Sequence, residues 1–157
     1  AYILKLADKG DNLEENKLKI LENIKNGKAY NKFLELVQNQ NGDIEYVKNT
    51  DKFEKAKYIL PVICEKDGYV EKLNAGEVGK ISVDLGAGRL RKEDDIDKAV
   101  GIVLNKKNAD KVKKGDILAF VYANNKQKGE TAVEEMQDAY TIVEEPVKKE
   151  KYILGII

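Results

Sequence analysis

The sequence predicts an α+β fold in which a helical segment over residues 1–55 precedes a domain of mixed helices and strands over residues 56–157. Apolar side chains recur at helical spacing in the first segment, whereas short apolar runs separated by glycine and polar turns dominate the second. A chain of 157 residues has the length of one domain with an appendage. Its 42% hydrophobic and 36% charged residues are typical of a folded globular protein.

Two helices and a short helical turn are predicted in the first segment. The first helix covers residues 11–26, where Asn12 can cap its start and Gly27 fits the position just after its end. A second helix follows, with apolar side chains at helical spacing over residues 30–37. We expect one further helical turn at residues 43–49.

The mixed domain is predicted to contain six strands and two helices. The strands cover residues 58–63, 69–73, 98–104, 117–123, 141–144 and 152–157, and the helices cover residues 75–85 and 128–140. Pro61 places the first strand near a sheet edge or bulge, because proline cannot donate to a neighbouring strand. The Asp67-Gly68 turn predicts that this strand pairs with the next one as a hairpin. Residues 117–123 are apolar on both faces, so we expect them inside a sheet.

Composition excludes several classes of function. The 28 basic and 28 acidic side chains cancel, which argues against nucleic acid as a partner. The apolar runs are much shorter than a membrane span, and no secretory signal is visible. The chain has no histidine, which removes the most frequent general base and metal ligand. Its single cysteine cannot form an internal disulfide, so we expect a cytoplasmic protein.

A glycine–arginine loop is the most particular feature of the sequence. The backbone N–H groups of Gly86, Ala87 and Gly88 could hold a small anion, but a dinucleotide fingerprint needs a third glycine where Arg91 stands. The alternative is a helix end followed by a tight turn that glycine permits. Arg89 and Arg91 are the only arginines of the chain. Their donor forks suit either a contact to another domain or ligand, or ion pairs with the nearby carboxylates.

The acidic run after the loop does not predict a metal site. Glu93, Asp94, Asp95 and Asp97 lack the spacing, the glycine and the terminal glutamate of a calcium loop. We therefore expect them to form the solvated start of a helix. Cys64 lies in an apolar strand and is expected to be a small core residue. No catalytic, metal-binding or cofactor-binding residue is predicted in this chain.

Several of these motifs together resemble one enzyme family. They are LGAGRLRKEDDIDKAVGIVL at residues 85–104, KVKKGDILAFVYAN at 111–124, KDGYVEKL at 66–73, and the helical stretch at 7–43 with its NGKA turn. Their combination is similar to the C-terminal region of the pyrimidine-nucleoside and thymidine phosphorylases. The chain starts without methionine and inside an apolar pattern, so we expect a piece of a longer protein of this family.

The resemblance implies a hammerhead-like α+β domain, with a bent antiparallel sheet flanked by helices and with residues 1–55 as the tail of a preceding α/β domain. It also implies a homodimeric parent in which phosphate attacks a pyrimidine nucleoside and leaves a pentose 1-phosphate. The N-terminal α and α/β domains hold nucleoside and phosphate in the family, so this chain alone is expected to be inactive. Residues Gly86, Ala87, Gly88 and Arg89 match the loop that takes part in closing the active-site cleft.

Two other interpretations remain open from the sequence. GYVEKL and KVKKGDILAFVYANN also resemble half of a biotinyl or lipoyl carrier domain. A carrier needs its modified lysine at a hairpin tip within a characteristic tripeptide, and Lys126 lies between asparagine and glutamine instead. A standalone interaction module is the other alternative.

Overall fold

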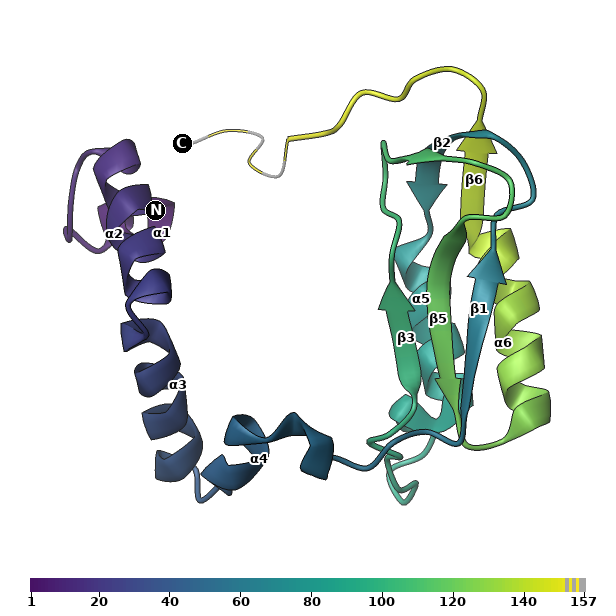
Figure 1. The fold of residues 1–157 in the computed structure, drawn as a ribbon, viewed down its shortest axis with the longest axis horizontal. Coiled ribbons are helices and arrows are strands. Elements are labelled where there is room, and N and C mark those ends of the chain that lie inside the picture. The colour runs from purple at the N-terminus through teal and green to yellow at the C-terminus, as the bar shows by residue number, and fades with distance from the viewer. Residues whose placement is uncertain (152, 154, 156–157) are drawn as a thin grey trace. The chain divides into compact units, whose positions relative to one another are not determined.

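The computed structural model describes residues 1–151, 153 and 155, and divides into two compact units, Ala1–Phe53 and Glu54–Ile157 (Figure 1). Helices make up the first unit, and the second combines helices with antiparallel strands. The predicted α+β class is therefore confirmed. The strand predicted over residues 152–157 falls largely outside the described residues.

Capping residues mark both ends of the helix predicted over residues 11–26, as the sequence predicts. The elements are α1 (Tyr2–Leu6), α2 (Leu13–Lys25), α3 (Lys28–Asn39), α4 (Ile44–Lys48) and a 3₁₀ turn (Thr50–Lys52). Asn12 Oδ1 accepts a hydrogen bond from the Glu14 N–H at 2.9 Å and so starts α2. After α2, Gly27 has a φ of +80°, a left-handed conformation that suits a residue without Cβ.

This first unit has no apolar core of its own. Asn16 is the one buried residue between Ala1 and Phe53, a range that the structure describes completely. Its Nδ2 donates to the Gly10 carbonyl at 2.8 Å and fixes the connection between α1 and α2. Many apolar side chains on the helices are exposed, including Leu21 and Phe33 at 48% and 49%, and the others are half-buried. The predicted apolar helix faces therefore exist, but the rest of this unit covers them only in part.

The described residues of the second unit form two antiparallel sheets of three strands, in the orders β1-β5-β3 and β4-β2-β6. Its elements are β1 (Tyr58–Ile63), β2 (Gly68–Leu73), α5 (Ala75–Ser82), an irregular helical turn (Val83–Ala87), β3 (Gly101–Leu104), β4 (Lys111–Val112), β5 (Ile117–Ala123), α6 (Lys126–Ala139) and β6 (Tyr140–Val143). The central place of β5 confirms the expectation drawn from its two apolar faces. Pro61 lies in the edge strand β1, also as predicted.

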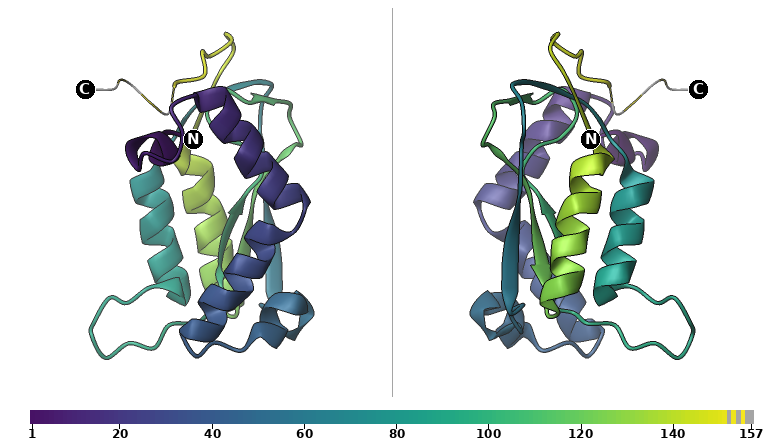
Figure 2. Two further views of the ribbon diagram at one scale, coloured as in Figure 1. Left: turned by 90° about the vertical axis from the view of Figure 1, so that its left-hand side faces the viewer. Right: turned by 90° about the vertical axis from the view of Figure 1, so that its right-hand side faces the viewer.

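The core of the second unit lies between the strands and two helices. Figure 2 shows α5 and α6 side by side over one face of the strands. Gly129 allows α6 to approach β1, because a Cβ there would lie 2.7 Å from Leu60 Cδ1. Buried side chains from both layers fill the space between them, among them Val62, Ile81, Val121 and Met136.

The predicted hairpin between residues 58–63 and 69–73 is wrong. β1 pairs with β5, whereas β2 pairs with β4 and β6 in the other sheet. The residues between the two strands bond to a distant turn instead: the Cys64 N–H donates to the Asp116 carbonyl at 2.8 Å, and Asp67 Oδ1 accepts from the Lys114 N–H at 2.7 Å. These bonds separate the two strands, so each joins a different sheet.

The helix start predicted for residues 93–97 is also wrong, since no helix lies between the irregular turn and β3. Asp94 Oδ2 accepts hydrogen bonds from the Leu90 and Arg91 N–H groups at 3.1 and 2.8 Å. Asp97 Oδ1 accepts from the Ala99 N–H at 3.0 Å. Such local side-chain-to-backbone bonds compete with the helical pattern and hold the segment as a loop. The strand predicted from residue 98 accordingly begins only at Gly101.

Candidate functional site

The two glycines of the glycine–arginine loop serve different local needs. Gly86 has a φ of +113°, which a residue with a Cβ adopts only under strain. Gly88 is extended, but a Cβ there would lie 2.6 Å from Val83 Cγ2. The loop therefore leaves the end of α5 through a tight turn that both glycines permit, as the structural alternative predicted.

The arginines stand on the exposed part of this loop. Arg89 and Arg91 are both exposed, and Leu90 between them is 74% exposed. Within residues 1–151, 153 and 155, neither guanidinium forms an ion pair or hydrogen bond. The predicted alternative of pairing with Glu93, Asp94 or Asp95 is thus not found. The Asp94 carboxylate instead fixes the backbone that presents the arginines.

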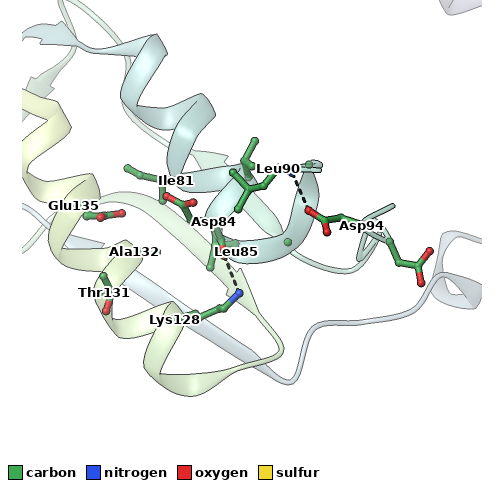
Figure 3. Close-up of a pocket in the computed structure, with 13 residues that line it drawn as sticks. Ile81, Asp84, Leu85, Leu90, Asp94, Lys128, Thr131, Ala132 and Glu135 are labelled. Atoms are coloured by element: carbon green, nitrogen blue, oxygen red, sulfur yellow. Dashed lines mark hydrogen bonds between the residues drawn. The ribbon is translucent and has the colours of Figure 1, made fainter. Parts of the chain in front are cut away.

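A cavity of about 620 Å³ opens between this loop and α6 (Figure 3). Its apolar lining includes Ile81, Leu85, Leu90 and Ala132, and its charged lining comprises Asp84, Asp94, Asp95, Lys128 and Glu135. Lys128 Nζ donates to the backbone carbonyl of Asp84 at 3.1 Å, so this bond ties α6 to the turn before the loop.

The charge around the cavity argues against a small anion. Four carboxylates line it against one lysine, whose ammonium already bonds to a carbonyl oxygen. A phosphate placed among these carboxylates would be repelled, since like charges a few ångströms apart disfavour each other. The cavity therefore provides an apolar recess with an acidic rim beside the loop.

Asp97 and Asn124 join the far end of the loop to the sheet. Asn124 Nδ2 donates to Asp97 Oδ2 at 2.7 Å, and Asn124 Oδ1 accepts from the Lys57 N–H at 2.9 Å. The Asp97 N–H donates to the Gly86 carbonyl at 2.9 Å. The sequence gives no sign of this set, because Asp97 stands among other acidic residues and Asn124 lies 27 positions away.

The acidic run does not gather into a metal-binding group. Among the described residues, no three histidine, cysteine, aspartate or glutamate side chains are arranged to hold a metal ion. The carboxylates of Asp94 and Asp97 instead accept hydrogen bonds from backbone and side-chain N–H groups of the loop and its surroundings.

Lys126 does not occupy the hairpin tip that a carrier domain needs. It is the first residue of α6, which Asn125 caps through a hydrogen bond from the Lys128 N–H at 3.1 Å. Its Nζ lies 3.6 Å from Glu130 Oε1, one helical turn on. A strand-to-helix junction in place of a hairpin disfavours the carrier interpretation.

Cys64 is a buried residue just after β1, and its Sγ donates to the Lys66 carbonyl at 3.1 Å. The expectation of a small core residue is confirmed. Tyr140, the first residue of β6, is also buried, and its hydroxyl lies 2.9 Å from the Lys106 carbonyl and 3.1 Å from that of Leu118. Burial raises the pKa of Tyr140 to about 12, with a smaller contribution from the Asp110 charge.

In the part of the chain that the structure describes, none of the helices combines the length and apolar character that crossing a membrane requires.

Comparison with known proteins relates these features to one family. Residues 69–143 match the family model of the pyrimidine nucleoside phosphorylase C-terminal domain. The chain is 40% identical over 142 residues to the pyrimidine-nucleoside phosphorylases of Staphylococcus aureus strains USA300 and NCTC 8325. Each match covers 90% of this chain and 33% of the relative, so the chain spans about a third of the length of these relatives.

Proposed function

Because the chain carries a C-terminal domain of the pyrimidine-nucleoside phosphorylase family, we propose that it works as the C-terminal part of such an enzyme. In the proposed reaction, phosphate attacks the anomeric carbon of a pyrimidine nucleoside, the base leaves, and a pentose 1-phosphate remains. The whole enzyme is then a pentosyltransferase. We further propose that nucleoside and phosphate bind to N-terminal α and α/β domains, and that the parent is a cytoplasmic homodimer.

The role proposed for this chain is packing against those domains and closing the active-site cleft, without direct participation in the chemistry. One observation carries it: Arg89 and Leu90 project from a loop whose backbone is fixed at both ends, and the Arg89 guanidinium has no partner among the described residues. A guanidinium so placed can bridge a carboxylate or carbonyl of another domain. Closure of this kind excludes water and aligns the reactants.

The helical segment has its own proposed role. We assign residues 1–55 to the tail of the preceding α/β domain and residues 56–157 to the C-terminal domain. The exposed apolar faces of α2 and α3 support this assignment, because helices with such faces are normally covered by another layer.

Replacing Arg89 with alanine tests the closure role. We expect Arg89→Ala, in an active enzyme that contains this chain, to lower kcat/KM by about ten- to a hundredfold, the effect of one or two lost charge-assisted hydrogen bonds. The melting temperature should stay unchanged, because Arg89 is exposed and its guanidinium forms no hydrogen bond or ion pair within the described part of the chain. Steady-state kinetics with uridine and thymidine, beside a melting curve, measure both quantities.

Lys92→Ala is the matched control, since Lys92 is an exposed cation on the same loop. It should retain the activity of the parent. Equal activity of both variants and the parent would show that Arg89 is an ordinary surface residue. A large drop in melting temperature for Arg89→Ala would show that it stabilises the fold instead.

A further inference from the structure

A continuous series of hydrogen bonds connects the start of β1 to the glycine–arginine loop. The Lys57 N–H donates to Asn124 Oδ1 at 2.9 Å, and Asn124 Nδ2 donates to Asp97 Oδ2 at 2.7 Å. The Asp97 N–H then donates to the Gly86 carbonyl at 2.9 Å. Residues that are far apart in the sequence thus meet around one amide and one carboxylate.

Each group in the series can act only as a hydrogen-bond donor or only as an acceptor at its position. The Lys57 N–H can only donate and the Asp97 carboxylate can only accept, so the Asn124 amide has a single orientation that satisfies both. The second oxygen of Asp97 accepts from the Ala99 N–H at 3.0 Å, which fixes the carboxylate as well. Hydrogen bonds to an ionised group are about twice as strong as neutral ones. Asp97 and Asn124 are both partly buried, which limits competition from water.

The position of Lys57 determines which two parts of the chain this series of hydrogen bonds connects. Lys57 directly precedes β1 and lies within the stretch 54–57 that follows the helical unit in the sequence. At the other end, Gly86 lies in the irregular turn that leads to Arg89, with a φ of +113° that residues with a Cβ rarely adopt. A displacement of the chain before β1 therefore acts on Asn124, and through Asp97 on the loop.

We propose that Asn124 and Asp97 are positioning residues that couple the chain before β1 to the orientation of the glycine–arginine loop. The inference rests on the proposed closure function for its biological use, because only a closing enzyme requires the loop to follow the preceding segment. The coupling itself is a property of this chain and can be measured without any activity. Failure of the coupling would leave the Arg89 experiment above unaffected.

Exchanging the two side chains tests the coupling. Asn124→Asp places a second carboxylate beside Asp97, and Asp97→Asn leaves two amides that cannot satisfy Lys57, Ala99 and each other together. In the double exchange Asp97→Asn with Asn124→Asp, every hydrogen-bond donor again has an acceptor. The amide introduced at position 97 can then donate to the carboxylate introduced at position 124, which still accepts from the Lys57 N–H. A chain of specific hydrogen bonds therefore predicts that two damaging changes compensate each other.

Amide hydrogen exchange in the 157-residue chain is the measurement. We expect each single variant to speed exchange of the Leu90 and Arg91 amides by about tenfold, although these bond to Asp94 and not to the exchanged pair. The double variant should return to within about threefold of the parent. Asn108→Asp is the control: it adds the same charge at an exposed asparagine whose Oδ1 accepts from the Leu73 N–H, and it should leave the loop amides unchanged.

The proposal is overturned if Leu90 and Arg91 exchange at the parental rate in both single variants, or if the double variant stays as unprotected as the single ones. Where a single variant proves unfolded by circular dichroism, the double variant and the parent are compared alone. Parental protection in the double variant then supports the coupling, and lost protection contradicts it.

Discussion

The buried hydroxyl of Tyr140 makes stability depend on alkaline pH. Its pKa in the folded chain is raised to about 12 by burial, whereas tyrosine in an unfolded chain titrates near about 10. The unfolded state therefore loses this proton first as pH rises. The stabilising contribution is complete below about pH 10 and disappears progressively between about pH 10 and pH 12.

Tyr140→Phe should remove this part of the pH dependence. We expect the variant to be less stable by about 1–3 kcal/mol near neutral pH, because the Lys106 carbonyl loses its partner, and to lose less stability than the parent between about pH 10 and 12. Urea unfolding at stepped pH measures both effects. Val62→Ala is a control that is destabilised through the core alone, so its slope should match the parent. Parallel slopes for Tyr140→Phe and the parent would contradict the expectation.

At the residue scale, the sequence predicted which loop is unusual but not how it is held. Gly86 and Gly88 stand out because the tight turn that requires residues without a Cβ is formed by neighbouring residues. A local sequence pattern therefore indicates it. The bond from Asn124 to Asp97 joins residues 27 positions apart, and both residue types are common in polar loops. No local pattern distinguishes such a contact from two solvated side chains, so only the folded chain reveals it.

Among the elements, the helices of the first unit are expected to be the least protected part of the chain. Ile3 and Leu6 are 80% and 81% exposed, and no apolar side chain of this unit is buried among its described residues 1–53. β1 and β5, by contrast, contain Val62 and Val121, which are both 0% exposed. Local opening costs less free energy where fewer apolar contacts must break.

Hydrogen exchange measured along the whole chain checks this expectation. Amides of α2 and α3 should exchange at least about tenfold faster than those of β1 and β5, a difference of about 1.4 kcal/mol in opening free energy. The sample must be monomeric, since self-association would cover the apolar faces. Equal protection of both units in a monomer would show that the helices are stable without a covering layer.

The elements themselves were predicted more reliably than their pairing. Helix boundaries depend on nearby residues, and Asn12 and Gly27 mark the ends of α2 for that reason. Strand pairing depends on distant ones: the Asp67-Gly68 turn suggested a hairpin, but Asp67 bonds to Lys114 and the two strands separate. The acidic run failed as a helix start because its carboxylates bond to their own backbone.

At the scale of the whole molecule, the charges, the cavity and the family similarity all agree with the proposed non-catalytic role of this chain. The cavity beside the loop has an acidic rim, which disfavours phosphate, and the chain has no histidine. The matched region covers 33% of the relatives, so catalytic residues of such enzymes can lie in the part of their chains outside the match. This chain provides an exposed arginine on a fixed loop and apolar helix faces that are largely exposed, and both features agree with the proposed packing against other domains.

The isolated 157-residue chain should therefore release no base from uridine or thymidine in the presence of phosphate. The physical reason is that the cavity beside the glycine–arginine loop carries four carboxylates against one lysine, and that the chain has no histidine to act as a general base. Free base is measured by chromatography after prolonged incubation, with a full-length pyrimidine-nucleoside phosphorylase from S. aureus as the positive control. The Arg89→Ala chain serves as a second sample, because contaminating enzyme would give the same trace activity in both preparations. The contrary result is release of base that scales with the concentration of the parent chain and persists through repeated purification. It would place catalytic residues in this chain and contradict the proposal that the chain takes no direct part in the chemistry.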